Sequence, residues 1–199
     1  PAIDFGKGRI QEVLKACRIL HEKGEHIVFE VSGPLTILNV LIDPKYVFKG
    51  MRKKPELMAR IFAKLGKEIL AYMKLAKEQG ADFISYADSS GGVNILGPKM
   101  AEQMVDLFTY DFVKQAEKLA DEHTMLLLCP KTTFALLGTG KAKLIDCQIH
   151  ADRSQEEDSL SYAEACIQMK GKIRFAGQTC IKNLDYRMKN GIMKEVHIL

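Results

Sequence analysis

An apolar segment that runs into a carboxylate and then a glycine-rich loop constrains the fold of this chain more than any other feature. Residues 83–87 are apolar enough for a buried strand, and Asp88 and the loop 89–92 follow directly. The same order recurs where the apolar segment 125–128 leads into Cys129. In (β/α) barrels, catalytic groups lie at the carboxyl ends of strands, on the loops that lead to the next helix. We therefore expect catalytic groups at Asp88 and Cys129.

Helical and extended patterns alternate along the whole chain. Apolar side chains spaced three and four apart, with glycine and proline at the boundaries, predict helices at 10–20, 55–79, 98–123, 133–138, around Tyr162 and at 183–189. Apolar segments between them predict strands at 26–31, 83–87, 125–129, 143–149, 172–176 and 195–199. About six strands separated by helices indicate βαβ units and a parallel sheet, and hence an α/β fold.

The length of the chain limits how much of a barrel it can form. A complete (β/α) barrel needs roughly 250 residues, whereas this chain has 199, with a hydrophobic content of 47%. No linker or short repeat interrupts it, so we expect one domain over residues 1–199, an incomplete TIM-type barrel of about six parallel strands. Exposed strand edges are templates for pairing. We therefore expect a homo-oligomer or a partner chain that completes the barrel, with residues 196–199 or the first strand near the contact.

Composition argues against several partners. The net charge is only +4, and the lysines are spread along helical faces, so we expect no nucleic-acid partner. No apolar run approaches the roughly 20 residues that span a bilayer, and the charged first residues do not form a signal peptide, so we expect no membrane partner. The five cysteines form no CxxC pair, which favours reduced thiols in the cytoplasm.

Five short segments resemble one known family in their order and spacing. They are Val31–Thr36, Gly80–Asp88, Leu96–Lys99, Leu128–Thr133 and Phe175–Gly177. Together they resemble the uroporphyrinogen decarboxylase superfamily. The resemblance is closest to its corrinoid-dependent methyltransferases, which move a methyl group from a methylated corrinoid protein to a thiol. The resemblance covers nearly the whole chain and implies that its strands are the third to eighth of the family's barrel, with the first two βα units outside the chain.

The resemblance also implies a zinc ion and methylcobalamin, the latter carried by a corrinoid protein partner. In this branch a His-x-Cys pair after the fifth strand and a cysteine after the eighth hold the zinc, which lowers the pKa of the acceptor thiol. Cys129 matches the cysteine of the pair, but Leu127 stands at the histidine position, and no second cysteine follows the last predicted strand. Substitute ligands would be Cys147, His150 and Cys180. The alternative is that Cys129 is a buried barrel residue without a metal.

The expected substrate-binding residues surround these two positions. The resemblance assigns contacts with substrate or corrinoid to Gly33, Tyr86, Ser89, Gly91 and Gln178. Gln178 departs from the asparagine that the family often carries there. Ser85 and Tyr86 alternate within their strand, so only one of them should face the barrel interior. For Asp88, the alternative to a functional role is that its carboxylate caps the turn that follows it.

Three functions remain open from the sequence. The first is a methyltransferase-like protein, with Asp88 and Cys129 at the mouth of the cleft and catalysis either retained or lost. The second is a noncatalytic subunit of the same superfamily that binds a ligand or completes an assembly. The third is a decarboxylase of the uroporphyrinogen type, which needs groups that the family places in the early barrel and near its carboxyl end.

Overall fold

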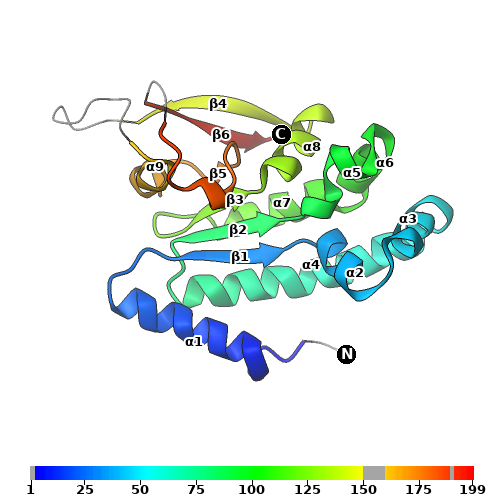
Figure 1. Cartoon of the computed structure of the whole chain (residues 1–199), viewed down its shortest axis with the longest axis horizontal. Coiled ribbons are helices and arrows are strands. Elements are labelled where there is room, and N and C mark those ends of the chain that lie inside the picture. The colour runs from blue at the N-terminus through cyan, green and yellow to red at the C-terminus, as the bar shows by residue number, and fades with distance from the viewer. Residues whose placement is uncertain (1–2, 150–159, 189–190) are drawn as a thin grey trace.

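The computed structural model describes residues 3–149, 160–188 and 191–199. Within these ranges the chain forms a six-stranded sheet with the order β1-β2-β3-β5-β6-β4, shown in Figure 1. The strands are β1 (Val28–Ser32), β2 (Phe83–Ala87), β3 (Met125–Leu128), β4 (Ala142–Gln148), β5 (Phe175–Ala176) and β6 (Ile192–Ile198). The sheet is open, with β1 and β4 at its two edges.

Helices connect most of these strands. They are α1 (Gly8–Glu22), α2 (Pro34–Leu41), α3 (Pro44–Lys53), α4 (Pro55–Glu78), α5 (Val93–Leu96), α6 (Pro98–Met104), α7 (Tyr110–Ala116), α8 (Pro130–Gly138) and α9 (Tyr162–Met169). Five of them begin at a proline, whose fixed φ and missing N–H suit the first helical position. The predicted helix over 98–123 is divided into α6, a π-helical turn and α7. No helix within the described ranges is long and apolar enough to cross a membrane.

Three of the five strand pairings are parallel and two are antiparallel. Strands β1, β2, β3 and β5 pair in parallel, whereas β6 pairs antiparallel with both β5 and β4. The α/β class and the incomplete, unclosed barrel are thus confirmed, but the prediction that all six strands run parallel is wrong for β6. A parallel connection needs a crossover, usually a helix. Between β5 and β6 the described residues contain only the 3-10 turn Ile181–Asn183, where we predicted a helix over 183–189, and the chain returns in the opposite direction.

Side chains alternate between two cores, one on each face of the sheet. Phe29, Ile84 and Leu126 join the core beneath α4 and α7, whereas Met125 and Leu127 join the core beneath α9. This alternation follows from the two-residue period of a strand. Because helices cover both faces of β2 and β3, every residue from 83 to 86 and from 125 to 128 is buried, and in these two strands polar groups become accessible only beyond the strand ends.

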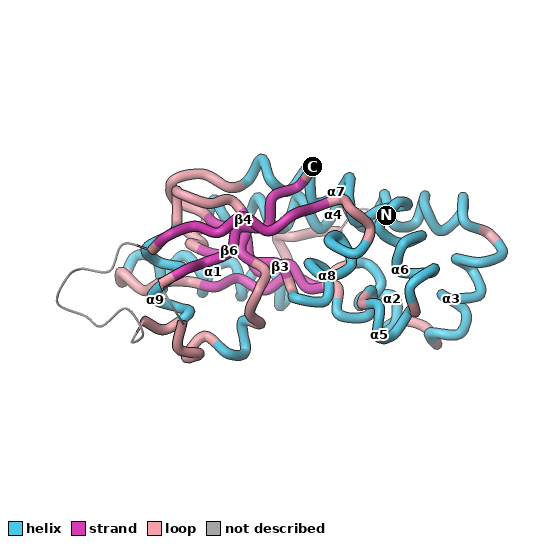
Figure 2. The backbone as a smooth tube through the Cα atoms, turned by 90° about the horizontal axis from the view of Figure 1, so that it is seen from above, coloured by secondary structure: helices cyan, strands magenta, loops and turns pink. Residues whose placement is uncertain are grey.

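The ends of the sheet differ in what surrounds them. The carboxyl ends of β1, β2 and β3 lead into α2, α5 and α8, and Figure 2 shows α2, α3, α5 and α6 gathered beyond this end.

The edges of the sheet bear on the predicted self-association. β6 lies between β5 and β4 but pairs unevenly with them: β4 pairs along its whole length, whereas β5 pairs with it at Glu195 alone. In the described sheet the outer strands are β1 and β4, and self-association through either edge stays a prediction.

Candidate functional site

Three of the predicted residues meet at the carboxyl ends of neighbouring strands. Gly33 follows β1, Asp88 follows β2 and Cys129 follows β3. The backbone N–H of Gly33 donates to the carbonyl oxygen of Ala87 at 2.9 Å, and that of Cys129 donates to Tyr86 at 2.9 Å. The parallel register of the three strands therefore brings these residues side by side, as the sequence predicts.

The carboxylate of Asp88 caps a helix. Its side chain is only 3% exposed and accepts hydrogen bonds from the backbone N–H groups of Leu35 (3.3 Å) and Thr36 (2.8 Å) and from the Thr36 hydroxyl (2.9 Å). The first N–H groups of a helix lack internal partners and favour negative charge. Asp88 thus caps α2, which follows the neighbouring strand, whereas the alternative raised from the sequence placed the cap in its own loop. Burial raises the pKa of the Asp88 carboxyl above its usual value, although these hydrogen bonds oppose the shift.

Gly33 is required because Asp88 approaches it closely. A Cβ atom built on Gly33 would lie 2.3 Å from Cβ and 2.5 Å from Cγ of Asp88, and 2.7 Å from the hydroxyl oxygen of Tyr86. The φ of Gly33 is −78°, which any residue can adopt, so the requirement is for space. Gly91 differs, since a Cβ there would meet Asp88 Cγ only at 3.6 Å, an ordinary contact.

Tyr86 lies on the α7 side of the sheet, and Ser85 faces the α9 side by the alternation of the strand. The Tyr86 ring is 1% exposed and lies 4.7 Å from the ring of Phe112, between centroids. Its hydroxyl accordingly reaches the strand end from inside the core, next to Gly33. Burial, and then the charge of Asp88, raises the pKa of Tyr86 well above its ordinary value. The hydroxyl therefore remains a proton donor at neutral pH.

Several buried hydroxyls at this end have no partner. Among the described residues, the buried side-chain polar atoms without a hydrogen bond are Oδ1 of Asn39 and the hydroxyls of Tyr86, Thr132, Thr133 and Tyr162. Tyr86, Thr132 and Thr133, which we call the strand-end hydroxyls, belong to the end of β2 and the first turn of α8. Buried polar groups are nearly always hydrogen-bonded, and an exception calls for an explanation. A ligand or water that completes their bonds would provide one.

Two of these residues were not predicted from the sequence. Thr132 and Thr133 follow Cys129 in the segment that carries the resemblance, so the signal was present in the strand-to-helix connection. The hydroxyl oxygen of Thr133 would lie 2.1 Å from a Cβ built on Gly177. Thr133 therefore contacts the end of β5, and the glycine of the Phe175–Gly177 segment makes room for it.

The residues around Cys129 do not form a zinc site. Leu127, at the position of the family's histidine, is buried in the core beneath α9. The part of the chain that the structure describes contains no group of three or more His, Cys, Asp or Glu side chains that could hold a metal ion. Cys147 lies on β4, three strands from β3, or about 14 Å at the usual strand spacing, and Cys180 forms no such group with Cys129. His150 lies outside the described residues. A catalytic zinc needs three protein ligands, and these residues do not supply them.

The remaining predicted residues lie around the same end. Ser89 and Gly91 bound a half-buried 3-10 turn that follows Asp88. Gln178 follows Gly177 at the end of β5 and is exposed. The structure therefore places Ser89, Gly91 and Gln178 at the accessible rim, and their contacts with a substrate remain predictions.

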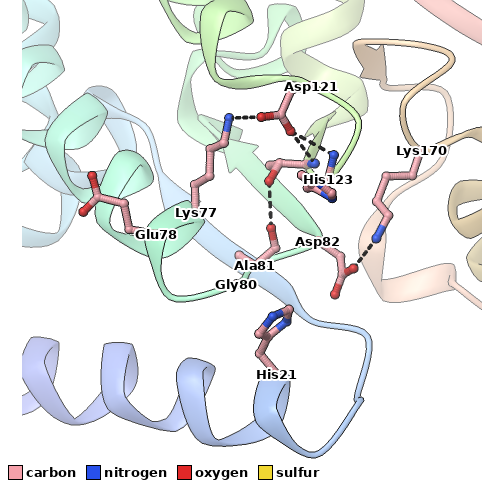
Figure 3. A pocket seen from close by; sticks show the side chains of 10 residues that line it. His21, Lys77, Glu78, Gly80, Ala81, Asp82, Asp121, His123 and Lys170 are labelled. Atoms are coloured by element: carbon pink, nitrogen blue, oxygen red, sulfur yellow. Dashed lines mark hydrogen bonds and ion pairs between the residues drawn. The ribbon is translucent and has the colours of Figure 1, made fainter.

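A separate cavity of about 450 Å³, not predicted from the sequence, lies at the amino ends of the strands. Figure 3 shows Lys170 reaching Asp82 and Lys77 reaching Asp121 across this cavity, with His21 and His123 beside them. The Lys77 ammonium lies 2.5 Å from Asp121. The charged groups that line the cavity are thus largely paired with one another. In barrel folds this end of the sheet usually serves stability.

Asp82 is the centre of that paired network. Its carboxylate accepts hydrogen bonds from the Ile27 N–H at 3.0 Å and from the Lys170 ammonium, and His26 lies 3.7 Å away. Burial by itself would raise the pKa of Asp82, but the hydrogen bonds from Lys170 and Ile27 and the nearby positive charge outweigh it, and the pKa falls below its usual value. Asp82 is therefore an ionised structural carboxylate.

The comparisons with known proteins agree with this architecture. The profile of the family described as uroporphyrinogen decarboxylase (URO-D) matches residues 1–171. Among solved structures, a methyltransferase from Methanosarcina mazei is similar, with a TM-score of 0.55 and 25% sequence identity over 68% of this chain. The match spans 41% of that methyltransferase, which is less than half its length. No curated protein matches significantly. Since the profile covers most of the chain, this protein belongs to the uroporphyrinogen decarboxylase family.

Proposed function

We propose that this chain forms part of a methyltransferase site that moves a methyl group from a methylated corrinoid protein to a thiol. The observation that carries the proposal is the group of unpartnered hydroxyls beside Cys129, at the carboxyl ends of β2 and β3. Family membership and the similarity to a methyltransferase support the reaction class. The match spans less than half of that enzyme, so the activity of a whole protein is part of the proposal.

The reaction requires little proton chemistry from the protein. The acceptor thiol releases its proton to solvent, and its sulfur then forms a bond with the methyl carbon as the cobalt–carbon bond breaks, with the electron pair of that bond staying on cobalt. The protein has to bind both reactants and exclude water, a task of positioning. The strand-end hydroxyls supply hydrogen-bond donors for this purpose, and Asp88 fixes the start of α2 against them. Asp88 is accordingly a positioning residue.

Zinc enters the proposal only through ligands beyond those described. When bound, zinc would lower the pKa of the acceptor thiol. The resemblance assigns Cys129 as a ligand of this zinc. Two further protein ligands would have to come from outside the described residues, because these contain no metal-binding group. All five cysteines are free thiols, which supports a reducing cytoplasm as the location.

A methyl-transfer assay tests the proposal. The chain would be mixed with methylcobalamin and a small alkane thiol, with its zinc content measured, and loss of the cobalt-bound methyl followed by absorbance. We expect turnover that Cys129→Ser lowers by about tenfold or more and that Cys147→Ser leaves unchanged, since Cys147 lies on the far edge strand. Absence of turnover with and without added zinc would exclude the methyltransferase function.

One observation favours a noncatalytic binding or assembly subunit as the second candidate. The Asp88 carboxylate accepts three hydrogen bonds that cap α2, which gives it a structural task. Such a subunit would bind methylcobalamin or a partner chain without turnover. Equilibrium binding of methylcobalamin in the absence of methyl transfer would favour this function, whereas turnover would reject it.

A further inference from the structure

Helix α3 presents positive charge on one face. Lys45, Lys49, Arg52 and Lys53 follow one another at spacings of four, three and one residues, so they project from the same side of α3. The opposite side, with Val47 and Met51, is buried. The basic residues line a groove of about 550 Å³ between α3 and Met100 of α6.

Most of this charge has no ion-pair partner among the described residues. Lys45 forms an ion pair with Asp43 at 2.9 Å, and Glu56 stands at the start of α4. The structure gives Lys49, Arg52 and Lys53 no ion pair or side-chain hydrogen bond within the described ranges, and all three are exposed. An anionic partner would therefore meet at least three free cations in a single turn of helix.

Large apolar side chains protrude beside these cations. Val40 is 82% exposed, Leu41 69% and Tyr46 59%, and Ile42 is also exposed. Val40, Leu41 and Ile42 form the last residues of α2 and the bend before α3, and Tyr46 lies in the first turn of α3. Together with Lys45, Lys49, Arg52 and Lys53, these four residues form a surface that we call the basic corner.

The basic corner occupies the far end of the molecule. Figures 1 and 2 both show α2 and α3 projecting beyond the carboxyl end of the strands, away from α1 and α9. The apolar bend at 40–42 and the basic face of α3 directly follow one another in the chain, so both belong to this end of the molecule.

We propose that the basic corner docks on an anionic lipid surface, with Val40, Leu41 and Ile42 entering the acyl boundary and the basic face of α3 contacting headgroups. The pairing of a protruding aliphatic and aromatic tip with a row of basic residues is typical of interfacial binding. Each basic residue near an anionic leaflet contributes attraction. A soluble polyanion such as a nucleic acid would use the cations but not the aliphatic tip. This inference differs from the expectation of no membrane partner and does not depend on the proposed methyl transfer.

Vesicle co-sedimentation of the full chain tests the proposal. We expect binding to vesicles of phosphatidylcholine mixed with phosphatidylserine and much weaker binding to phosphatidylcholine alone. The variant Lys49→Gln/Arg52→Gln/Lys53→Gln should weaken binding by about fivefold per charge removed, or on the order of a hundredfold. Its matched control is Arg9→Gln/Lys15→Gln/Lys23→Gln, which removes the same charges from the exposed side of α1 and should leave binding within about twofold of wild type.

A second variant separates a membrane from a soluble polyanion. Val40→Ser/Leu41→Ser should weaken vesicle binding by about tenfold or more while leaving binding to a single-stranded DNA oligonucleotide unchanged. Equal binding to neutral and anionic vesicles would overturn the proposal. So would vesicle binding that Val40→Ser/Leu41→Ser leaves intact, because the surface would then belong to a soluble polyanion. All substituted residues are exposed, and circular dichroism would verify that each variant is folded.

Discussion

The two ends of the parallel strands use buried polar residues in opposite ways. At the amino ends, Asp82 is held by Lys170 and the Ile27 N–H, and the buried hydroxyl of Thr124 donates to the Ala81 carbonyl oxygen at 3.1 Å. At the carboxyl ends, the hydroxyls of Tyr86, Thr132 and Thr133 are equally buried and have no hydrogen-bond partner in the part of the chain that the structure describes. Satisfied polar groups stabilise a fold, whereas unsatisfied ones cost free energy unless something else binds them.

This difference assigns a separate task to each end. At the amino end, which we call the clasp, the pair Asp82–Lys170 links the start of β2 to the residue after α9, and the pair Lys77–Asp121 links α4 to the segment before β3. At the carboxyl end, hydroxyl donors beside Cys129 lack partners among the described residues. Close packing there leaves no room for a Cβ atom at Gly33 and Gly177. Mutations at the amino end should therefore change stability, and mutations of the hydroxyls at the carboxyl end should change binding.

The largest expected effect is that of Gly33→Ala. The new Cβ would lie 2.3 Å from the Asp88 Cβ, an atom that cannot move without its backbone, so we expect a loss of about 3 kcal/mol in the free energy of unfolding. Urea denaturation would measure it. The control is Gly138→Ala, where the added methyl meets nothing within 4 Å and should change stability by less than about 1 kcal/mol. Equal stability of the two variants would mean that Gly33 and Asp88 are not packed together.

The second largest expected effect is that of removing the Lys170 ammonium. Lys170→Met leaves the Asp82 carboxylate, whose side chain is 11% exposed, without its ion partner, so we expect a loss of about 2 kcal/mol. Lys194→Met is the matched control, because the Lys194–Asp146 pair is exposed and should contribute less than about 0.5 kcal/mol. Thermal or urea unfolding of both variants measures the difference. A loss for Lys194→Met as large as that for Lys170→Met would show that the Asp82–Lys170 pair stabilises the protein no more than an exposed ion pair does.

A pair of isosteric threonine substitutions compares the two ends directly. Thr124→Val removes a buried hydroxyl that has a partner and should cost about 1 kcal/mol. Thr133→Val removes a buried hydroxyl without a partner and should be neutral within about 0.5 kcal/mol or slightly stabilising. Urea denaturation of the two variants and the wild type gives both values. If Thr133→Val were the more damaging, the hydroxyl of Thr133 would have a structural partner.

The pH dependence of stability should have opposite signs for the two buried carboxylates. The pKa of Asp82 is lowered, so its contribution is present above the ordinary value of about 3.9 and is lost as the pH falls through its folded pKa. The pKa of Asp88 is raised, so its contribution is present below about 3.9 and is lost as the pH rises through its folded pKa. Asp82→Asn and Asp88→Asn should therefore change the slope of unfolding free energy against pH in opposite directions. Slopes that change in the same direction would contradict both assignments.

Local patterns predicted the parallel part of the fold well. The apolar segments at 83–87 and 125–129 became β2 and β3, and the glycine and proline boundaries marked most helices, because these signals are set by neighbouring residues. The reversal of β6 was not predicted. The segment 195–199 has the same apolar pattern whether its neighbour runs parallel or antiparallel. The direction of β6 relative to β5 depends on the connection between these two strands.

The site was predictable in position and less so in chemistry. Residues Gly33, Asp88 and Cys129 were expected at strand ends and are found there. The hydrogen bonds of Asp88 were not predictable, since they come from Leu35 and Thr36, more than fifty residues earlier in the chain. Likewise, only the folded chain shows that Thr132 and Thr133 are buried without partners.

The most direct measurement combines methyl transfer from methylcobalamin to a thiol with unfolding free energy in Thr133→Val and Lys170→Met. We predict that Thr133→Val slows transfer by about tenfold at unchanged stability, because a donor at the site is lost. Lys170→Met should lower stability and keep the rate per folded molecule. Slower transfer in Lys170→Met with normal transfer in Thr133→Val, or no transfer by the wild type, would contradict the assignment of the carboxyl end as the functional site.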